Sequence, residues 1–430
     1  MSNRNNDDYF NLDNFDESLD SREYRRRQPN RRNTSYNGRP SYNKRKNMQR
    51  RKRVRLRNRI VIVVSGLLIL TLLITLIVLM FKGCGNSGND TRFVPTTTKP
   101  AEEEAMNNSV QSNDKLSTTN FILAKPTDDT SVEGVDAGTV YVWNNAAYEL
   151  FGGSDASAEA YSDTINGLAE KLPGINVYSM IVPNHTEMGL PERVKNQVNT
   201  NSQADNIKKA YAGMGDKVTA VNAYNYLSEH CNDYIYFKSD HHWTGLGSYY
   251  AYKAFADTLG LTPVKLEDCT EQTIDGFTGT FSTMANGIES DTVHYWKFPY
   301  DVSMTVTGAD GQNVESDSPY YELAEAGSNT YGVFIEGDNP VTVMKSSSEN
   351  AQSGKKIAVV KESYGNAFVP YLTANYEEVH VIDFRSFRNV VSQSFANYCS
   401  ENGITDVLFL NGIMSANTPM QLDSMEGMFN

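Results

Sequence analysis

The sequence contains few of the residues from which metal, redox or disulfide centres are built. Its 430 residues include four cysteines, Cys84, Cys231, Cys269 and Cys399, too few for a disulfide scaffold. A Cys231–Cys269 bridge is compatible with the sequence, but nothing in the sequence selects that pair. The chain has no H-x-x-x-H pair and no carboxylate cluster, and adjacent histidines chelate one ion poorly. It also lacks a phosphate-binding loop and a G-x-G-x-x-G motif. We therefore expect no metal and no cofactor.

Aliphatic residues are scarce in the first 59 residues, which hold 18 Lys/Arg and 7 Asp/Glu. Such a segment buries too little apolar surface to offset its chain entropy, so we expect it to be disordered. Arginine-rich tails with interspersed tyrosines are also found in nucleic-acid-binding proteins. We favour a tail that faces lipid and sets topology, with no nucleic-acid partner, because its basic run directly precedes an apolar segment.

Residues 60–81 contain no charge at all. Their length suits a membrane-spanning helix, which needs about 20 residues, better than the shorter apolar core of a cleavable signal peptide. Cys84 suggests a lipoprotein instead, but Lys82 fits such a cleavage site poorly. Residues 40–59 carry 10 Lys/Arg and residues 82–101 carry 3, which predicts a cytoplasmic N-terminus and an extracytoplasmic C-terminal part. We expect a single-pass signal anchor in the cell membrane, followed by a flexible tether over residues 82–117.

From about residue 118 to residue 430 the sequence alternates strand-like and helix-like segments. This alternation predicts an α/β/α sandwich with a mainly parallel sheet. Residues 265–350 lack a clear pattern, and we expect small strands and loops there, inserted beside the main sheet. The expected strands are 139–143, 176–182, 218–223, 356–360, 379–383 and 406–410; the expected helices are 156–172, 203–214, one that Thr244 caps, 365–376 and 389–402.

The segment Ser239-Asp240-His241-His242-Trp243-Thr244 concentrates an acid and two of the six histidines in the chain. In an extended backbone, side chains two residues apart point the same way, so Asp240 and His242 would share a face. His241 would point to the opposite face, as a structural residue. A carboxylate in that place can fix the tautomer and orientation of an imidazole, as in a Ser-His-Asp triad. The simpler alternative is a turn with a helix-capping aspartate and buried histidines.

Three polar residues follow expected strands of the last third of the chain: Ser363, Arg385 and Asn411. In sheets of this type ligands bind beyond the carboxyl ends of the strands. A serine between a strand and a helix is exposed, and nearby backbone N–H groups can stabilise an oxyanion. Polar residues are also common as caps at strand ends, so each of the three carries little weight alone. His185, after the 176–182 strand, could line the same cleft, although a loop histidine with satisfied hydrogen bonds is the simpler interpretation.

The sequences Asp240-His241-His242-Trp243-Thr244, Lys361-Glu362-Ser363-Tyr364-Gly365-Asn366-Ala367-Phe368 and Ile382-Asp383-Phe384-Arg385 together resemble the DHHW protein family. That family in turn resembles the exported alginate-type O-acetyltransferases, whose fold is a rearranged SGNH hydrolase. The resemblance covers about residues 120–415. It implies that Ser363 is the nucleophile, His242 the base and Asp240 its orienting acid. One departure is Glu362, where the family pattern has an aspartate that is one methylene shorter.

The resemblance also suggests further site residues. In SGNH enzymes an asparagine and a glycine complete the oxyanion hole, and Asn411 is the candidate for that asparagine. Arg385 is the candidate for holding an acyl or sugar group, and Tyr364 and Trp243 are further candidates for substrate contact.

Together these features predict a membrane-anchored, extracytoplasmic O-acetyltransferase that modifies a cell-envelope polysaccharide. A carbohydrate esterase of the SGNH type and a non-catalytic, glycan-binding envelope protein are the alternatives. Acetyl-coenzyme A is cytoplasmic, and residues 60–81 offer no polar route across the bilayer. The transferase interpretation therefore requires a partner, a multi-span membrane-bound O-acyltransferase that carries acyl groups across the membrane.

Overall fold

The computed structural model describes residues 115–128, 131–138 and 140–430. The predictions on the tail at 1–59, the apolar segment at 60–81 and nearly all of the tether at 82–117 lie outside these residues. Within the described part of the chain, no helix is long and apolar enough to span a bilayer.

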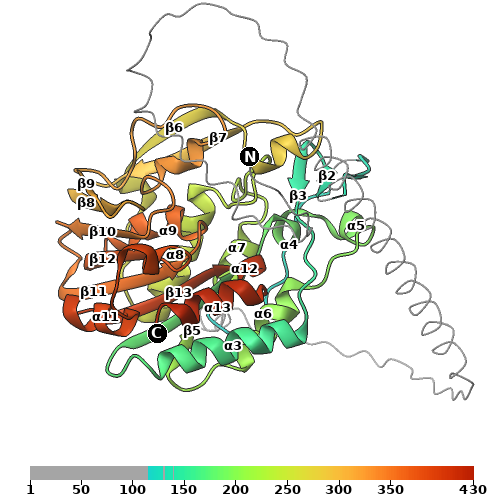
Figure 1. Cartoon of the computed structure of the whole chain (residues 1–430). Helices are drawn as coiled ribbons and strands as arrows, with labels where there is room; N and C mark the ends of the chain where they lie inside the picture. Colours follow the sequence, from blue (N-terminus) through green and yellow to red (C-terminus); the bar gives the residue numbers. More distant parts are fainter. Residues whose placement is uncertain (1–114, 129–130, 139) are drawn as a thin grey trace, which may run out of the picture. The chain divides into compact units, whose positions relative to one another are not determined.

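The fold is built on one eight-stranded sheet with the strand order β5-β4-β13-β11-β12-β10-β8-β9 (Figure 1). The first five strands in this order are parallel, and β10, β8 and β9 continue the sheet in antiparallel fashion. The α/β prediction is therefore confirmed. The strands of this sheet are β4 (Asn176–Val182), β5 (Val218–Ala220), β8 (Val302–Thr307), β9 (Asn313–Ser316), β10 (Val341–Ser346), β11 (Gln352–Lys361), β12 (Tyr376–Asp383) and β13 (Asp406–Gly412).

Helices cover both faces of this sheet. The helices are α3 (Asp155–Ala169), α4 (His185–Gly189), α5 (Glu192–Lys195), α6 (Gln203–Ala212), α7 (Ala223–Glu229), α8 (Gly245–Leu259), α9 (Gly365–Leu372), α10 (Phe387–Val390), α11 (Phe395–Asn402), α12 (Ile413–Ala416) and α13 (Pro419–Gly427). Contacts join α7, α8 and α9 into one layer against β4, β11 and β12, and join α3, α12 and α13 into another against β4, β5 and β13. Right-handed crossovers explain why the two groups of helices lie on opposite faces of the sheet. The connection from β11 to β12 and the connection from β12 to β13 run in opposite directions across the sheet, so they pass over different faces.

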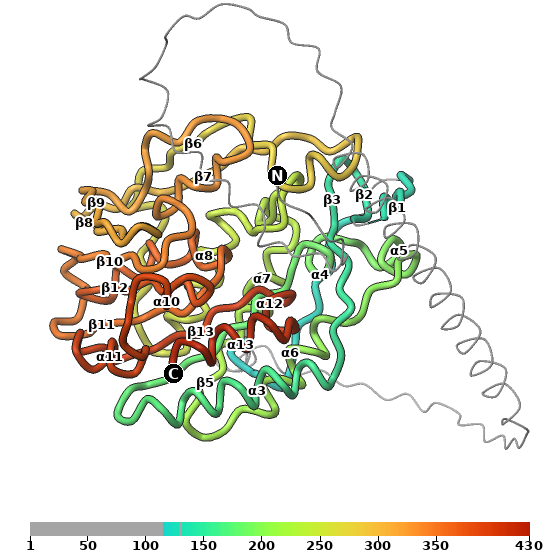
Figure 2. The backbone as a smooth tube through the Cα atoms, in the orientation of Figure 1, coloured from blue at the N-terminus to red at the C-terminus, as the bar shows by residue number. Residues whose placement is uncertain are grey.

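Two small antiparallel sheets lie outside the main one. One is formed by β1 (Val135–Asp136), β2 (Tyr141–Trp143) and β3 (Ala146–Tyr148), and the other by β6 (Thr270–Phe277) and β7 (Asp291–Lys297). Short 3-10 turns, η2 (Leu266–Asp268), η3 (Thr280–Thr283) and η4 (Thr330–Val333), complete the region 265–350. The backbone trace in Figure 2 shows β8 and β9 beside β10, at one end of the main sheet. The expectation that this region lies beside the sheet is therefore wrong for β8, β9 and β10, which extend it.

The central strands form where the sequence is continuously apolar. Every residue of β13 is buried, as are Ile357, Ala358, Val359 and Val360 of β11, as expected for parallel strands covered on both faces. Helix α8 begins where Thr244 accepts a hydrogen bond from the Gly247 N–H, which confirms the predicted cap. Cys231, Cys269 and Cys399 are free thiols, so the Cys231–Cys269 bridge does not form.

Candidate active site

Ser363 lies in the turn between β11 and α9, at the point in the sheet where the connections after two neighbouring strands leave in opposite directions. The connection after β11 enters one helix layer, and the connection after its neighbour β13 enters the other. A crevice opens at the carboxyl ends of two such strands, and ligands bind there in folds of this kind. Within this turn Glu362 and Tyr364 are buried and Ser363 is partly exposed, so a substrate can reach the serine.

Glu362 stabilises this turn from the inside. Its Oε2 accepts a hydrogen bond from the Tyr364 N–H at 2.9 Å, and its Oε1 accepts one from the Gly412 N–H at 2.7 Å. The side chain thus ties the end of β11 to the end of β13, and the extra methylene relative to aspartate spans this gap. Burial raises the pKa of the Glu362 carboxyl, although both N–H donors act in the opposite direction.

The segment with the two histidines is a bend, so the expectation of an extended backbone is wrong. An isolated antiparallel bridge between Tyr236 and Trp243 closes this loop. Inside the loop, Oδ1 of Asp240 accepts a hydrogen bond from the His242 N–H at 3.0 Å. An aspartate that bonds a backbone N–H two residues on forms an Asx turn. That turn brings the two side chains together, for a different reason from strand alternation.

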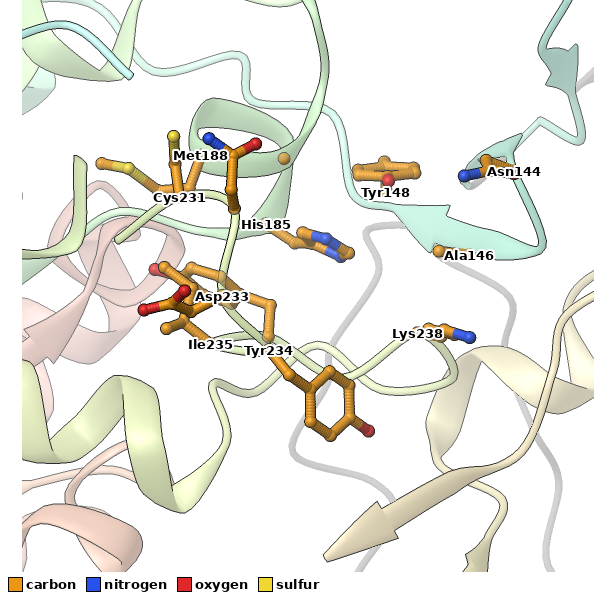
Figure 3. Close-up of a pocket in the computed structure, with 13 residues that line it drawn as sticks. Asn144, Ala146, Tyr148, His185, Met188, Cys231, Asp233, Tyr234, Ile235 and Lys238 are labelled. Carbon is orange, nitrogen blue, oxygen red and sulfur yellow. The ribbon is translucent and has the colours of Figure 1, made fainter. Parts of the chain in front are cut away.

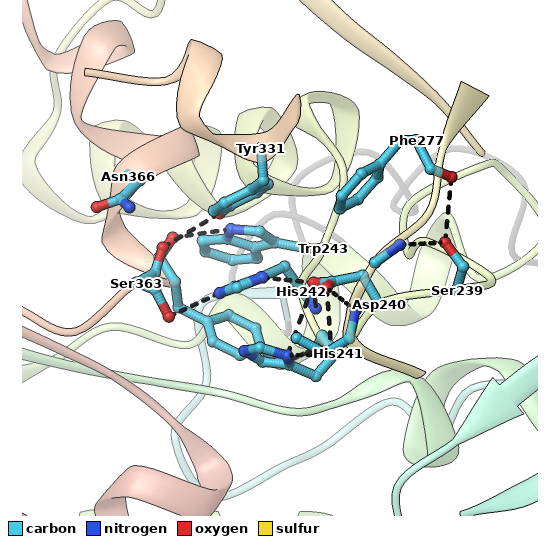
Figure 4. A network of polar contacts seen from close by, with 12 residues as sticks. Ser239, Asp240, His241, His242, Trp243, Phe277, Tyr331, Ser363 and Asn366 are labelled. Atoms are coloured by element: carbon cyan, nitrogen blue, oxygen red, sulfur yellow. Dashed lines mark hydrogen bonds and ion pairs between the residues drawn. The ribbon is translucent and has the colours of Figure 1, made fainter. Parts of the chain in front are cut away.

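Asp240, His242 and Ser363 form a continuous chain of hydrogen bonds (Figure 4). Nδ1 of His242 lies 2.5 Å from Oδ1 of Asp240, and Nε2 of His242 lies 2.7 Å from Oγ of Ser363. Because Nδ1 donates to the carboxylate, Nε2 is left as the acceptor for the serine hydroxyl proton. The structure therefore joins the three predicted triad residues across 121 positions of sequence.

Asp240 is surrounded by donors. Its Oδ2 accepts hydrogen bonds from the backbone N–H and the hydroxyl of Thr280, at 2.9 and 3.2 Å. Burial raises the pKa of the Asp240 carboxyl, but the imidazoles of His241 and His242 and these hydrogen bonds lower it more, to well below its usual range. The carboxylate therefore stays ionised and keeps the Nδ1 proton of His242 in place.

His241 does not point to the opposite face. Its ring centroid lies 3.8 Å from that of His242, and its Nδ1 lies 3.0 Å from the Thr280 hydroxyl. Burial and the neighbouring His242 lower the pKa of His241, although the carboxylates of Asp240, Glu149 and Glu362 act in the opposite direction. The bend explains the difference from the prediction, because alternation of side chains requires an extended strand.

Tyr331, in η4, is a site residue that the sequence did not reveal. Its ring stacks on His242 with a centroid distance of 4.1 Å and an angle of 9°. Its hydroxyl donates a hydrogen bond to the Ser363 carbonyl at 3.2 Å. The imidazole of His242 is thus enclosed between Tyr331 and His241, which restricts it to the orientation that reaches the serine. Thr280 was missed as well, and both residues come from the region without a recognisable pattern.

Trp243 and Tyr364 have structural roles. The indole N–H of Trp243, which is fully buried, donates to the Tyr364 carbonyl at 2.9 Å, and the Tyr364 hydroxyl donates to the His241 carbonyl. Both side chains thus bind the histidine loop to the serine turn. Neither is free for the substrate contact suggested for them, because Trp243 has no exposed surface and Tyr364 is 6% exposed.

Arg385 belongs to a cluster of four charged side chains behind the serine turn. It donates to both oxygens of Asp383, at 2.9 and 2.6 Å, and to Oδ2 of Asp338 at 2.7 Å. Lys361, fully buried, donates to Asp338 at 2.9 Å and to Asp383 at 3.3 Å. Asp338 also accepts a hydrogen bond from the Asn366 side chain at 2.9 Å. The guanidinium expected to hold substrate therefore helps to anchor α9 and the end of β12.

Asn411 does not lie at the serine. The strand β13 continues to Gly412, so Asn411 is inside the strand and not beyond its end. Its side chain is fully buried, and its Oδ1 accepts a hydrogen bond from the Tyr161 hydroxyl of α3 at 3.1 Å. The backbone N–H of Ser363 itself has no acceptor within the part of the chain that the structure describes, which makes it available to an oxyanion.

Asp240, His241 and His242 also lie close enough together to hold a metal ion. Both ring nitrogens of His242 already have partners, in Asp240 and Ser363. An ion bound through His242 would have to break one of these two contacts. The donor set therefore fits a serine-based triad better than a metal centre.

Comparisons with known proteins identify the family of the chain and proteins with a similar fold. The family model of the DHHW protein matches residues 102–382, more than half of the chain. A solved DHHW family protein from Eubacterium siraeum is 29% identical, with a TM-score of 0.61, over 69% of this chain and 99% of that one. PatB1 of Bacillus cereus, solved with a sulfonyl adduct, is 19% identical, with a TM-score of 0.54, over 66% of this chain and 96% of that one.

A more distant match covers 69% of this chain and 99% of the O-acetyltransferase domain of Pseudomonas putida AlgJ, at 11% identity and a TM-score of 0.38, which is too remote to support an argument. No curated protein sequence matched the chain. The extent of the family match, together with the motif that gives the family its name, shows that this chain belongs to the DHHW protein family.

Proposed function

We propose that the chain is a membrane-anchored, extracytoplasmic O-acyltransferase that moves an acetyl group onto a cell-envelope polysaccharide. The observation that carries this proposal is the chain of hydrogen bonds from Asp240 through His242 to Ser363. An orienting acid, a base and a hydroxyl nucleophile in this order are the groups that acyl transfer through a serine ester requires.

In the first half of the reaction, Oγ of Ser363 attacks the carbonyl carbon of the acyl donor while its proton moves to Nε2 of His242. The bond between the acyl carbon and the leaving group then breaks, and the imidazolium returns the proton to that group. In the second half, His242 takes the proton of a sugar hydroxyl, whose oxygen attacks the serine ester. Ser363 leaves with the proton from His242, so the protein returns to its starting state.

Three features support these steps. Each tetrahedral intermediate carries a negative charge on the former carbonyl oxygen, and we assign the Ser363 N–H as its backbone donor. Asp240, held ionised, stabilises the imidazolium that forms twice in each cycle. Burial raises the pKa of the Tyr331 hydroxyl well above its usual range, so Tyr331 remains a donor to the Ser363 carbonyl throughout.

A carbohydrate esterase is our second candidate function. Ser363 is partly exposed, so water could reach an ester formed on it, and the same triad would then hydrolyse the ester. The non-catalytic, glycan-binding alternative agrees less well with the uninterrupted hydrogen bonds between the three residues. A degenerate site would have no need to hold His242 between two rings and against a fully paired carboxylate.

Labelling with a sulfonyl fluoride tests whether Ser363 is an activated nucleophile. PatB1, which shares the fold, was solved with a sulfonyl adduct, so a sulfonyl reagent allows the two proteins to be compared. We expect mass spectrometry to locate the label on Ser363 in the wild type, and no label in the Ser363→Ala variant. Ser415→Ala, a serine of α12, is the matched control and should label normally. Absence of label on Ser363 in folded protein would refute an acyl-enzyme mechanism.

An acetyl-ester assay with and without acceptor sugar separates transfer from hydrolysis. Acetylated sugar indicates the transferase, and free acetate at the same rate in both reactions indicates the esterase.

The anchor and the acyl carrier have a separate test in cells. Deleting residues 60–81 from an exported form should abolish glycan acetylation, because the tether would no longer hold the site near its carrier. Full activity of the unanchored form would contradict this part of the proposal.

A further inference from the structure

A pocket with a volume of about 320 Å³ is lined by residues other than those of the triad (Figure 3). Its walls come from the turn between β2 and β3, from α4, and from residues 231–238, which lead into the histidine loop. Pockets of roughly 300–1,000 Å³ are the usual size of small-molecule sites. The pocket therefore has room for one or two rings of a sugar chain.

The lining combines aromatic rings with polar side chains, among them the charged Asp233 and Lys238. Tyr148 packs against His185 at 4.3 Å between ring centroids, and Tyr234 lies on the opposite wall. Asn144 and Asn232 bring side-chain amides to the rim, and both are exposed. Tyr148 is buried beneath His185, so the ring of the half-buried Tyr234 is the one that can contact the C–H face of a sugar, while the two amides bond its hydroxyls.

The charge of the region disfavours an acidic ligand. The ammonium of Lys238 is paired with Glu289 at 2.5 Å, and burial lowers the pKa of His185 to about 3, so this imidazole is neutral. Residues 82–430 hold 21 basic and 45 acidic residues, which gives this part of the chain a net charge of −24. A field of that sign repels polyanionic chains such as polyuronates and leaves neutral ones unaffected.

Two segments link this pocket to the triad. The segment with Tyr234 and Lys238 on the pocket wall reaches Asp240 two residues later. On the other side, Ala147, next to Tyr148 on the pocket wall, donates its N–H to the Lys238 carbonyl at 2.9 Å, two residues before Asp240. A chain that places one sugar in the pocket would therefore run beside the catalytic loop.

We propose that this pocket binds a neutral sugar unit of the acceptor glycan and so positions a neighbouring unit at Ser363. The inference rests on the proposed transferase function for its biological meaning. The binding itself needs no turnover and is measured without it.

The test uses the full chain with Ser363→Ala, in a detergent without a sugar head group, and isothermal titration calorimetry. The probes are tetrasaccharides of N-acetylglucosamine, of glucose and of a uronic acid. We expect at least one neutral tetrasaccharide to bind and the uronic acid tetrasaccharide not to bind. The double substitution Asn144→Gly and Lys238→Met should weaken the binding at least tenfold. Glycine suits position 144, because Asn144 has a φ of 48°.

The matched control is Lys345→Met, since Lys345 is an exposed lysine of β10 with its own carboxylate partner, Glu378, outside the pocket. This control should bind like the parent. If neither neutral probe binds, if the double variant binds unchanged, or if the uronic acid probe binds more tightly, the inference is wrong. Sulfonyl labelling of the wild type keeps the two proposals apart. Labelled Ser363 without glycan binding refutes only the pocket, and glycan binding without labelled Ser363 refutes only the acyl-enzyme.

Discussion

Replacing Asp240 with asparagine tests how the structure uses this carboxylate. Asp240 accepts four hydrogen bonds, two from His242 and two from Thr280. An amide has one acceptor oxygen, and its nitrogen is a donor. If the oxygen stays with Thr280, the amide N–H₂ faces Nδ1 of His242 and forces the proton onto Nε2. His242 then donates to Ser363 and can no longer accept the serine proton.

We expect kcat for an activated ester to fall on the order of 10⁴-fold, the scale seen when a triad carboxylate becomes an amide. Stability should fall by about 1–3 kcal/mol at pH 7, the cost of leaving a buried donor unpaired. The difference in stability between wild type and Asp240→Asn should become smaller as the pH falls. Because the folded-state pKa of Asp240 is depressed, its stabilising contribution is complete above about pH 4, the value of a free aspartate, and declines as the pH falls further.

Activity is followed with a chromogenic acetyl ester, and unfolding is followed by thermal melts from pH 7 to pH 3. The melting curves of wild type and Asp240→Asn should differ at pH 7 and converge toward pH 3. Asp233→Asn is the control, since this aspartate lies in the preceding segment with its side chain 46% exposed. An Asp240→Asn variant with near wild-type kcat would refute the role of Asp240 in fixing the tautomer.

The remaining predictions concern the residues around the triad. His242→Ala should remove nearly all turnover. His241→Ala should cost less, because His241 contacts the base without contacting Ser363, and the reverse order in steady-state kinetics would contradict this assignment. Adding Ser363→Ala to His242→Ala should cost no further activity, since the two groups act as one unit. Lys361→Met should destabilise the protein by about 3–5 kcal/mol in denaturant melts, because it removes the buried cation that pairs with Asp338 and with the buried Asp383, and Asp338→Asn in the same chain should recover part of the loss. Equal stability of Lys361→Met and wild type would contradict the role of the charge cluster.

The residues of the site differ in how far the sequence could predict them. Ser363 follows an apolar run that reads clearly as a strand, and Asp240 and His242 stand in a dense and unusual motif. Both signals are local, and the resemblance to a family supplied the link between them. The pairing of side chains two residues apart was predicted correctly, but the cause is an Asx turn in a bend.

Other residues could not be predicted because their roles depend on contacts between distant segments. Thr280 and Tyr331 lie in a region of short strands and loops, where nothing in the sequence indicates that they reach Asp240 and His242. Asn411 was misassigned because the edge of a strand is uncertain by a residue or two, and in β13 two more residues turn an exposed end into a buried interior. An arginine at the end of a strand is a residue type that often binds substrate. Only the fold shows that the Arg385 side chain is hydrogen-bonded to Asp338 and Asp383.

The residues that support the triad lie on peripheral turns, and their position affects how the site responds to partial unfolding. The acid Asp240 is held by Thr280 from one short turn, the base His242 is stacked by Tyr331 from another, and neither turn belongs to the central strands. Local opening of peripheral segments generally requires less free energy than global unfolding. Heat or mild denaturant should therefore abolish the proposed activity while the main sheet is still folded, so that loss of turnover precedes loss of the far-ultraviolet circular dichroism signal. Catalytic activity would then report the integrity of the loops, and spectroscopy that of the sheet.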